Sequence, residues 1–395
     1  MQYQGGFARA ERISAIEISE IVQLSEKASA LRAAGHDIVA LSTGEPDLPT
    51  PAHVVEAAHA AACGGQTRYP PTMGTPELRE AIAGRAGVVR SQVIISTGAK
   101  QVLANAMLAS LNPGDEVIIP APYWTSYSDI VALAGGQSII VPCPMSQGFK
   151  LTPEQLEASI TPRSRWLMLN SPSNPSGAVY SVAELRALAA VLMRHPRLLL
   201  LVDEIYRHLS YAPFTSFTEV VPELARRTLV VDGVSKAYSM TGWRIGWGIG
   251  PADMIRAIGA VQGQLTSGAC SVSQAAALSA LTGDQNLLME RLDLFRARRD
   301  RVIAALNAMD GVRCPVPDGT FYVFPDISEV MRRTGHATDA AFCAELLERT
   351  GVAIVPGRAF GLPGHARLSF AYSDTDLENG LGRMTDLIAG NSAPA

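Results

Sequence analysis

A lysine in a glycine-rich loop is the residue whose surroundings most suggest covalent chemistry. Lys236 follows the apolar run 228–231 and precedes Arg244 in the same loop. Desolvation or a nearby guanidinium would lower the pKa of this amine, because both disfavour its charged form. A neutral amine is a nucleophile, so Lys236 is a candidate for covalent catalysis.

A carboxylate follows a second apolar run. Asp203 comes directly after residues 198–202, and Tyr206 adds a phenol to the same segment. A buried carboxylate is costly unless a cation pairs with it, which indicates a positively charged partner for Asp203. A plain helix cap is the alternative interpretation of this aspartate.

Two further segments could hold an anion or donate hydrogen bonds. The turn 97–99, Thr-Gly-Ala, leads directly into a helical segment, where exposed backbone N–H groups could bind a phosphate. Asn174 lies in the loop 170–177, where prolines and a glycine would fix its amide. An ordinary strand-to-helix turn and ordinary turn punctuation are the alternatives.

An α/β sheet would position all of these groups. Between residues 93 and 250, short β-rich runs alternate with helical segments, and several runs are apolar without alternation, as strands covered on both faces are. We predict a mainly parallel sheet covered by helices, in which ligands bind beyond the carboxyl ends of the strands. The expected strands begin at residues 93, 116, 138, 166, 198 and 228, and the expected crossover helices span 98–111 and 181–194, the second with a capping box of Ser181 and Glu184.

The C-terminal part predicts a second, smaller domain. A chain of 395 residues is long enough for two domains. A long charged helical pattern over 284–309 would lead from the first domain into the second. Strand-like segments follow at 319–324, 352–355 and 367–371, with helical stretches between them.

The composition favours small-molecule chemistry. The net charge of -4 gives no broad basic field for nucleic acid or a membrane surface. The 5 cysteines are odd in number and lack a C-x-x-C pair, which indicates reduced thiols. The 7 histidines have no metal-ligand spacing, and neither a signal peptide nor a membrane-spanning run is visible. We therefore expect a cytoplasmic protein without a metal, nucleic-acid or membrane partner.

These polar groups together meet the needs of one cofactor. Pyridoxal 5'-phosphate requires an amine for its aldehyde, an anchor for its phosphate, an anion for its ring nitrogen and donors for its ring hydroxyl. The candidates are Lys236, the turn 97–99, Asp203, and Asn174 with Tyr206. The sequence therefore predicts a pyridoxal-phosphate site.

The chain resembles the class I aminotransferases of fold type I, in the branch of bacterial aspartate and prephenate aminotransferases. The matching motifs begin, in the order of the family, at Gly44, Arg68, Pro122, Asn170, Asp203, Ser235 and Arg367. The resemblance implies a large cofactor domain, 47–284, with a mainly parallel seven-stranded sheet covered by helices. It also implies a smaller α/β domain formed by the N-terminal segment 1–46 and by residues 285–395.

The resemblance assigns the cofactor contacts residue by residue. Lys236 would hold the cofactor as a Schiff base and later move a proton, and Asp203 would pair with the ring nitrogen. Asn174 and Tyr206 would bind the ring hydroxyl, which makes Lys236, Asp203 and Tyr206 the expected catalytic residues. The other expected cofactor-binding residues are Trp124 on the ring face, Gly98, Ala99, Ser235 and Arg244 at the phosphate, Lys100 beside the phosphate turn, and Tyr69, which would reach the phosphate from a second subunit in a homodimer with shared active sites.

The resemblance also implies an amino-group transfer with ping-pong kinetics. Arg367 would clamp the α-carboxylate of the substrate, and Lys100 would bind a distal carboxylate beside Arg12. Aspartate or glutamate is the favoured donor, and 2-oxoglutarate or oxaloacetate the favoured acceptor. The full set of expected substrate-binding residues is Gly44, Trp124, Asn174, Arg367, Lys100 and Arg12.

Two departures from the family leave alternatives open. Glu17 and Ile18 stand in the segment 14–19 where relatives more often carry small hydroxyl residues around position 18, and Gly233 replaces a hydroxyl residue used elsewhere in the wider class. An aromatic or broad-specificity aminotransferase therefore stays possible, and so does a β-lyase that uses the same cofactor.

Two other classes fit the sequence less well. A dinucleotide-dependent dehydrogenase could be argued from the glycines of 246–250, but their spacing is G-x-G-x-G and we expect no strand–turn–helix unit after them. A DNA-binding regulator would need a further N-terminal domain. We expect no room for one, because the resemblance already begins near Arg12.

Overall fold

A seven-stranded sheet forms the centre of the computed structural model, which describes residues 9–14, 16 and 19–390. The strand order is β2-β8-β7-β6-β5-β3-β4, and all neighbours from β7 to β4 are parallel. The mainly parallel seven-stranded sheet of the sequence prediction is therefore confirmed. The strands are β2 (Val93–Ser96), β3 (Glu116–Ala121), β4 (Gln137–Pro142), β5 (Ser164–Asn170), β6 (Leu199–Asp203), β7 (Thr228–Gly233) and β8 (Gly246–Ile249).

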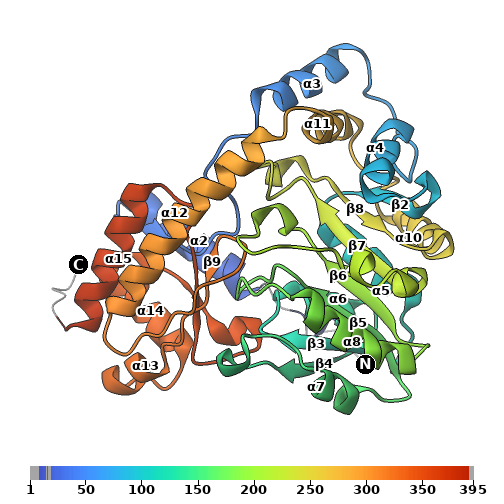
Figure 1. The fold of residues 1–395 in the computed structure, drawn as a ribbon. Helices are drawn as coiled ribbons and strands as arrows, with labels where there is room; N and C mark the ends of the chain where they lie inside the picture. The colour runs from blue at the N-terminus through green and yellow to red at the C-terminus, as the bar shows by residue number, and fades with distance from the viewer. Residues whose placement is uncertain (1–8, 15, 17–18, 391–395) are drawn as a thin grey trace, which may run out of the picture.

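Helices cover both faces of this sheet (Figure 1). The expected crossover helices are confirmed as α5 and α8, and Ser181 and Glu184 form the predicted capping box at the start of α8. The helices of this part are α3 (Ala52–Cys63), α4 (Pro76–Ala86), α5 (Ala99–Ser110), α6 (Ser126–Leu133), α7 (Pro153–Ser159), α8 (Val182–Arg194), α9 (Phe217–Val220), α10 (Ala252–Leu265) and α11 (Ser271–Thr282).

Strand alternation decides which face each polar residue reaches. Successive side chains of a strand point to opposite faces of the sheet. In the central strand β6, Leu201 packs with α5, α6 and α10, whereas Leu200 and Val202 pack with α8 on the other face. Asp203 follows in the same alternation, so its carboxylate points to the face that α5 and α6 cover.

The glycines of 246–250 have a packing role that the sequence analysis missed. Gly246 and Gly248 lie within β8, which is antiparallel to both β7 and β2. A Cβ atom at Gly246 would lie 2.2 Å from the backbone nitrogen of Ala99, so only glycine lets the strand approach the start of α5. The helix α10 follows β8, so the expectation that no strand–turn–helix unit occurs here was wrong. The dinucleotide fingerprint still fails on the spacing of its glycines.

The second part of the molecule joins both ends of the chain. The long helix α12 (Asn286–Ala308) leads into it, as the charged pattern predicted. Strand β1 (Val39–Ala40) is parallel to β10 (Val352–Ala353), so the N-terminal segment packs with the C-terminal one. The remaining elements are α1 (Glu11–Ser14), α2 (Glu20–Ala33), β9 (Tyr322–Val323), α13 (Ser328–Thr334), α14 (Asp339–Thr350), β11 (Val355–Pro356), β12 (Ala366–Ser369) and α15 (Asp374–Ile388).

One hydrophobic core holds this second part together. Val39 and Leu41 of the N-terminal segment share it with Leu306 of α12, Leu346 of α14 and Leu381 of α15. Burial of such side chains contributes roughly 1.5–3 kcal/mol each, so the two chain ends stabilise each other. We propose on this ground that residues 1–46 and 285–395 form the smaller domain and residues 47–284 the larger one.

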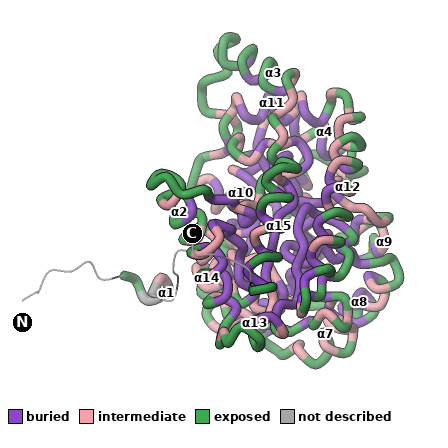
Figure 2. Tube along the Cα trace, turned by 90° about the vertical axis from the view of Figure 1, so that its left-hand side faces the viewer, coloured by how far each residue is buried: buried purple, intermediate pink, exposed green. Residues whose placement is uncertain are grey.

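Burial varies along the outer surface of the molecule. Figure 2 shows long exposed stretches at α3 and α2, while the central strands β2, β6 and β7 are buried at nearly every position. Among the helices of the described residues, none is both long enough and apolar enough to cross a membrane.

Candidate active site

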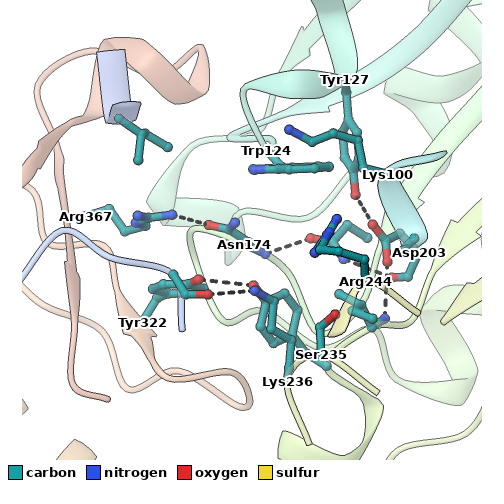
Figure 3. A pocket seen from close by; sticks show the side chains of 16 residues that line it. Lys100, Trp124, Tyr127, Asn174, Asp203, Ser235, Lys236, Arg244, Tyr322 and Arg367 are labelled. Atoms are coloured by element: carbon teal, nitrogen blue, oxygen red, sulfur yellow. Dashed lines mark hydrogen bonds between the residues drawn. The ribbon is translucent and has the colours of Figure 1, made fainter. Parts of the chain in front are cut away.

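A cavity of about 280 Å³ opens at the carboxyl ends of the central strands. Strand ends of the large sheet supply one side of it, and β12 with the N-terminal segment supplies the other (Figure 3). Most residues that the sequence analysis selected line this cavity: Gly44, Ala99, Lys100, Trp124, Asn174, Asp203, Tyr206, Ser235, Lys236, Arg244 and Arg367.

Lys236 points into the cavity from the loop after β7. Its Nζ atom donates a hydrogen bond to the carbonyl oxygen of Gly44 at 2.6 Å. Burial lowers the pKa of the amine to about 8, and the positive charges of Arg367 and Arg244 add to this effect. About a tenth of this lysine is therefore neutral at pH 7 and about half at pH 8, so the nucleophilic form is far more populated than for an ordinary lysine.

Asp203 ends the central strand as an almost fully buried carboxylate. Its Oδ2 atom accepts a hydrogen bond from the Tyr127 hydroxyl at 2.7 Å, and its Oδ1 atom accepts one from the Ile205 N–H at 3.2 Å. Burial raises its pKa to about 6, although the two hydrogen bonds and the charge of Lys236 oppose this rise. The group is mostly ionised at pH 7, so it can pair with a cationic ring nitrogen. The helix-cap interpretation does not apply, because no helix begins at this residue.

A cradle for an anion lies at the start of α5. Gly98 precedes the helix with φ at 83°, a conformation that favours glycine. A Cβ atom there would lie 2.5 Å from Nη2 of Arg244, so the guanidinium packs directly against the first turn. The buried Ser235 also lines the cavity near Arg244. Backbone N–H groups, a helix N-terminus and a guanidinium are together suited to bind a phosphate.

Arg367 reaches the opposite side of the cavity from β12. It is only 2% exposed, and its guanidinium donates to the Oδ1 atom of Asn174 at 3.0 Å and to the carbonyl oxygen of Ser42 at 2.6 Å. Its Nε atom is buried without a hydrogen-bond partner. A buried cation with an unused donor is well suited to bind a carboxylate from outside the chain.

Tyrosines extend the polar wall between these two sides. The hydroxyls of Tyr206 and Tyr322 lie 3.1 Å apart, and both rings are buried. Burial raises the pKa of Tyr206 well above its ordinary value, so its phenol stays protonated and can donate a hydrogen bond. The Arg367 guanidinium lies 4.4 Å from the centre of the Tyr322 ring.

Two other expected ligands stand at the edge of the cavity. Trp124 forms part of the wall, and Nζ of Lys100 lies 4.7 Å from the centre of its ring. Figure 3 shows Lys100 on one side of this ring and Lys236 with Arg367 on the other. The Lys100 side chain is exposed, so it has freedom to move toward a substrate.

Three expected residues are absent from the cavity wall. Gly98 is the N-cap residue of α5 and directly precedes Ala99, which does line the wall. Tyr69 is 93% exposed on the surface of the chain, and Arg12 is exposed in α1. The departures noted at Glu17 and Ile18 lie outside the described residues.

The structure adds cavity residues that the sequence analysis missed. Tyr127, Tyr322 and Ile21 line the wall but belong to no recognisable motif. Helical spacing after Trp124 could have pointed to Tyr127. Tyr322 and Ile21 come from segments whose position depends on the packing of the smaller part against the sheet, so the sequence carried no signal for them.

The residues present fit pyridoxal phosphate. The cavity joins an amine of lowered pKa, a buried carboxylate, an anion cradle that a side chain at position 98 would fill, and donors from Asn174 and Tyr206. Each requirement of the cofactor therefore has a residue that can meet it.

Comparison with known proteins agrees with this interpretation of the cavity. The pattern of the family "Aminotransferase class I and II" matches residues 36–384. The chain is 49% identical over 394 residues to the aspartate aminotransferase of Rhizobium meliloti (strain 1021), with 96% of each chain covered. It is 48% identical to the aspartate/prephenate aminotransferase of Cereibacter sphaeroides, covering 97% of this chain and 99% of that one.

Two solved structures also superpose closely on this chain. The crystal structure of the aspartate aminotransferase from Rhizobium meliloti superposes with a TM-score of 0.92 at 48% identity, over 97% of this chain and 99% of that one. The aspartate aminotransferase from Thermus thermophilus with maleate superposes with a TM-score of 0.90 at 40% identity, over 97% and 100% of the two chains.

Proposed function

This chain belongs to the class I and II aminotransferases, and we propose that its cavity exchanges an amino group between aspartate or glutamate and a 2-oxo acid. The enzyme is a transaminase, and its cofactor is pyridoxal phosphate. The observation that carries the proposed site is the meeting of Lys236, Asp203 and Arg367 at one cavity.

Each side chain then has a defined task. Bound pyridoxal phosphate supplies a carbon that takes up the amino group and a protonated ring that withdraws electrons from the substrate. Asp203 holds the proton on the ring nitrogen, because a buried anion stabilises a neighbouring cation. Asn174 and Tyr206 orient the ring through its hydroxyl, and Trp124 covers one face of the ring.

Lys236 serves first as the attachment point and then as the base. Once a substrate amine has displaced it, its freed Nζ can accept the α-proton of the substrate and deliver a proton to the cofactor carbon that carries the amino group. A pKa near 8 suits both directions of this transfer, because the two protonation states are then both populated near neutral pH. The same residues work in reverse on the second substrate, which gives ping-pong kinetics.

The substrate carboxylates would bind to two cations. Arg367 takes the α-carboxylate with its unused N–H group, helped by the Gly44 N–H and by Asn174. Lys100 takes the distal carboxylate of a dicarboxylic substrate. Arg12 stays the proposed second cation for this carboxylate, although it lies on α1 outside the cavity wall. The names of the relatives, which are aspartate and aspartate/prephenate aminotransferases, favour this assignment.

An aromatic or broad-specificity aminotransferase is the second candidate. Ile21 adds an aliphatic surface to the cavity wall, where it could contact an apolar substrate side chain. A hydrophobic contact of this size changes substrate preference by roughly 1–3 kcal/mol, so it could widen the range of donors without excluding aspartate.

We also propose a homodimer with shared active sites in the cytoplasm. Tyr69 exposes 93% of its surface in the single chain, and a second copy would bury it and let its hydroxyl reach the phosphate of the neighbouring site. Absence of this dimer in sedimentation equilibrium would contradict the shared-site assignment of Tyr69.

A half-reaction titration tests the proposed function. The purified yellow protein is titrated with aspartate, glutamate, phenylalanine and alanine, and the absorbance of the lysine-bound cofactor is followed. We expect aspartate and glutamate to remove this band and to yield their 2-oxo acids. A β-lyase needs a donor with a β-leaving group, so release of pyruvate, ammonia and chloride from β-chloroalanine in a parallel assay would indicate that activity. Retention of the band with every donor would reject transamination.

A further inference from the structure

Tyr127 is a cavity residue to which no step of the proposed mechanism assigns a task. It stands in the first turn of α6 and is 2% exposed. Since α6 covers the same face of the sheet to which Asp203 points, the ring of Tyr127 fills the space between this helix and the end of β6. Figure 3 shows its hydroxyl directed at the Asp203 carboxylate.

The hydroxyl of Tyr127 holds one oxygen of that carboxylate. The distance from this hydroxyl to Oδ2 of Asp203 is 2.7 Å, and the Ile205 N–H holds the other oxygen at 3.2 Å. Burial and the adjacent negative charge raise the pKa of Tyr127 well above its ordinary value. The phenol therefore remains protonated and always donates, which favours the ionised form of the aspartate.

The ring of Tyr127 supports a second cofactor contact. Its centroid lies 5.6 Å from that of Trp124, and the two planes meet at 88°, an edge-to-face arrangement. The N–H of Tyr127 also donates to the Trp124 carbonyl oxygen at 2.9 Å. The position of the indole plane is therefore tied to the same side chain that holds Asp203.

We propose that Tyr127 is a positioning residue that fixes two cofactor contacts at once: its hydroxyl orients and charges Asp203 for the ring nitrogen, and its ring supports Trp124 against the ring face. This inference rests on the proposed pairing of Asp203 with the ring nitrogen. It makes a separable statement about each half of the side chain, because the hydroxyl acts through Asp203 and the ring acts through Trp124.

Two non-covalent probes distinguish these halves. Pyridoxine 5'-phosphate has the ring nitrogen but no aldehyde, so Lys236 cannot bond it, and its analogue with a C–H group in place of the ring nitrogen cannot pair with Asp203. Both are titrated into the full-length chain after the cofactor has been removed by dialysis against an amino donor. Dissociation constants are measured from tryptophan fluorescence, which requires no turnover.

We expect Tyr127→Phe to weaken binding of pyridoxine phosphate on the order of tenfold, as loss of a hydrogen bond to a charged group does. Binding of the carbon analogue should change by less than about twofold, because the aromatic ring is kept. Tyr127→Leu should weaken binding of both probes. Equal effects of Tyr127→Phe on the two probes, or no effect on either, would overturn the role of the hydroxyl.

Two further variants complete the design. Tyr180→Phe is the matched control, since this buried tyrosine also loses a hydroxyl with a partner, the Leu151 N–H at 2.8 Å, but lies outside the cavity wall. Tyr180→Phe should leave the dissociation constants of both probes unchanged. Asp203→Asn should reduce the preference for the nitrogen-containing probe. If it does not, the proposed pairing of Asp203 fails; if it does and Tyr127→Phe does not, only the present inference fails.

A pH series gives a readout that a merely structural role would not move. Removal of the Tyr127 hydroxyl removes a cause that lowers the pKa of Asp203, so this carboxyl should protonate at a higher pH in Tyr127→Phe. Affinity for pyridoxine phosphate should then decline at a higher pH than in the unmodified protein. If the midpoint of this pH dependence is unchanged and only the melting temperature falls, Tyr127 has a packing role alone.

Discussion

The two sides of the cavity are built in different ways. The cofactor side comes from strand ends of one sheet, where Asn170 and Asp203 are register partners on neighbouring strands. The substrate side joins Gly44 and Ile21 of the N-terminal segment to Arg367 near the other end of the chain. Backbone hydrogen bonds fix the first side, whereas packing between distant segments fixes the second. The cofactor side should therefore keep its affinity for the cofactor when substrate contacts are changed. The substrate side should determine which amino donors the enzyme accepts.

Lys236→Ala should have the largest effect, because this residue serves both sides. Loss of the base should reduce kcat by about 10²–10⁴-fold, while cofactor still binds without a covalent link. Steady-state rates and borohydride labelling of the lysine measure the two effects. Lys27→Ala removes an exposed lysine paired with Glu348 and should change neither. Near-normal turnover of Lys236→Ala would reject its assignment.

Arg367→Lys separates the two sides of the cavity. A lysine cannot form the bidentate fork, so KM for the amino donor should rise by roughly 10- to 100-fold. The affinity for pyridoxine phosphate should stay within about twofold, since Arg367 belongs to the substrate side. A matching loss of cofactor affinity would show that the two sides are not independent.

The pH dependence of pyridoxine phosphate binding examines the cofactor side alone. The pKa of Asp203 is raised to about 6, so its charge is present above that pH and is lost as pH falls through it. Affinity should therefore be nearly constant above pH 7 and should fall by up to about tenfold per pH unit below 6, as the pairing anion disappears. The carbon analogue is the control, and an equal decline for it would point to the phosphate site instead.

Lys100→Ala should have the smallest effect. An exposed cation contributes up to about 1 kcal/mol to an ion pair, so kcat/KM for aspartate should fall about fivefold. The value for phenylalanine should not fall, because that donor has no distal carboxylate. A parallel fall for both donors would assign Lys100 to the cofactor side, through its contact with Trp124.

Local patterns predicted the cofactor side in detail. Runs without alternation marked strands covered on both faces, and β7 is indeed buried at every position. Polar residues immediately after such runs had to meet at one sheet edge, because parallel strands end there together. The short strands of the smaller part were less visible: of the expected strand 319–324, only Tyr322–Val323 forms β9. Strands this short are stabilised by their packing and not by their own pattern.

The sequence by itself determined the chemistry of this protein: an anion cradle, fixed donors, a carboxylate and an amine after the strands β2, β5, β6 and β7, in an order that resembles one enzyme family. Only the tertiary structure decided which neighbouring residues position those groups. It brought Tyr127 to Asp203, left the Arg367 Nε without a partner and placed Ile21 on the wall. The physical reason is that strand ends converge by backbone geometry alone, whereas contacts between separate layers depend on how side chains pack across them.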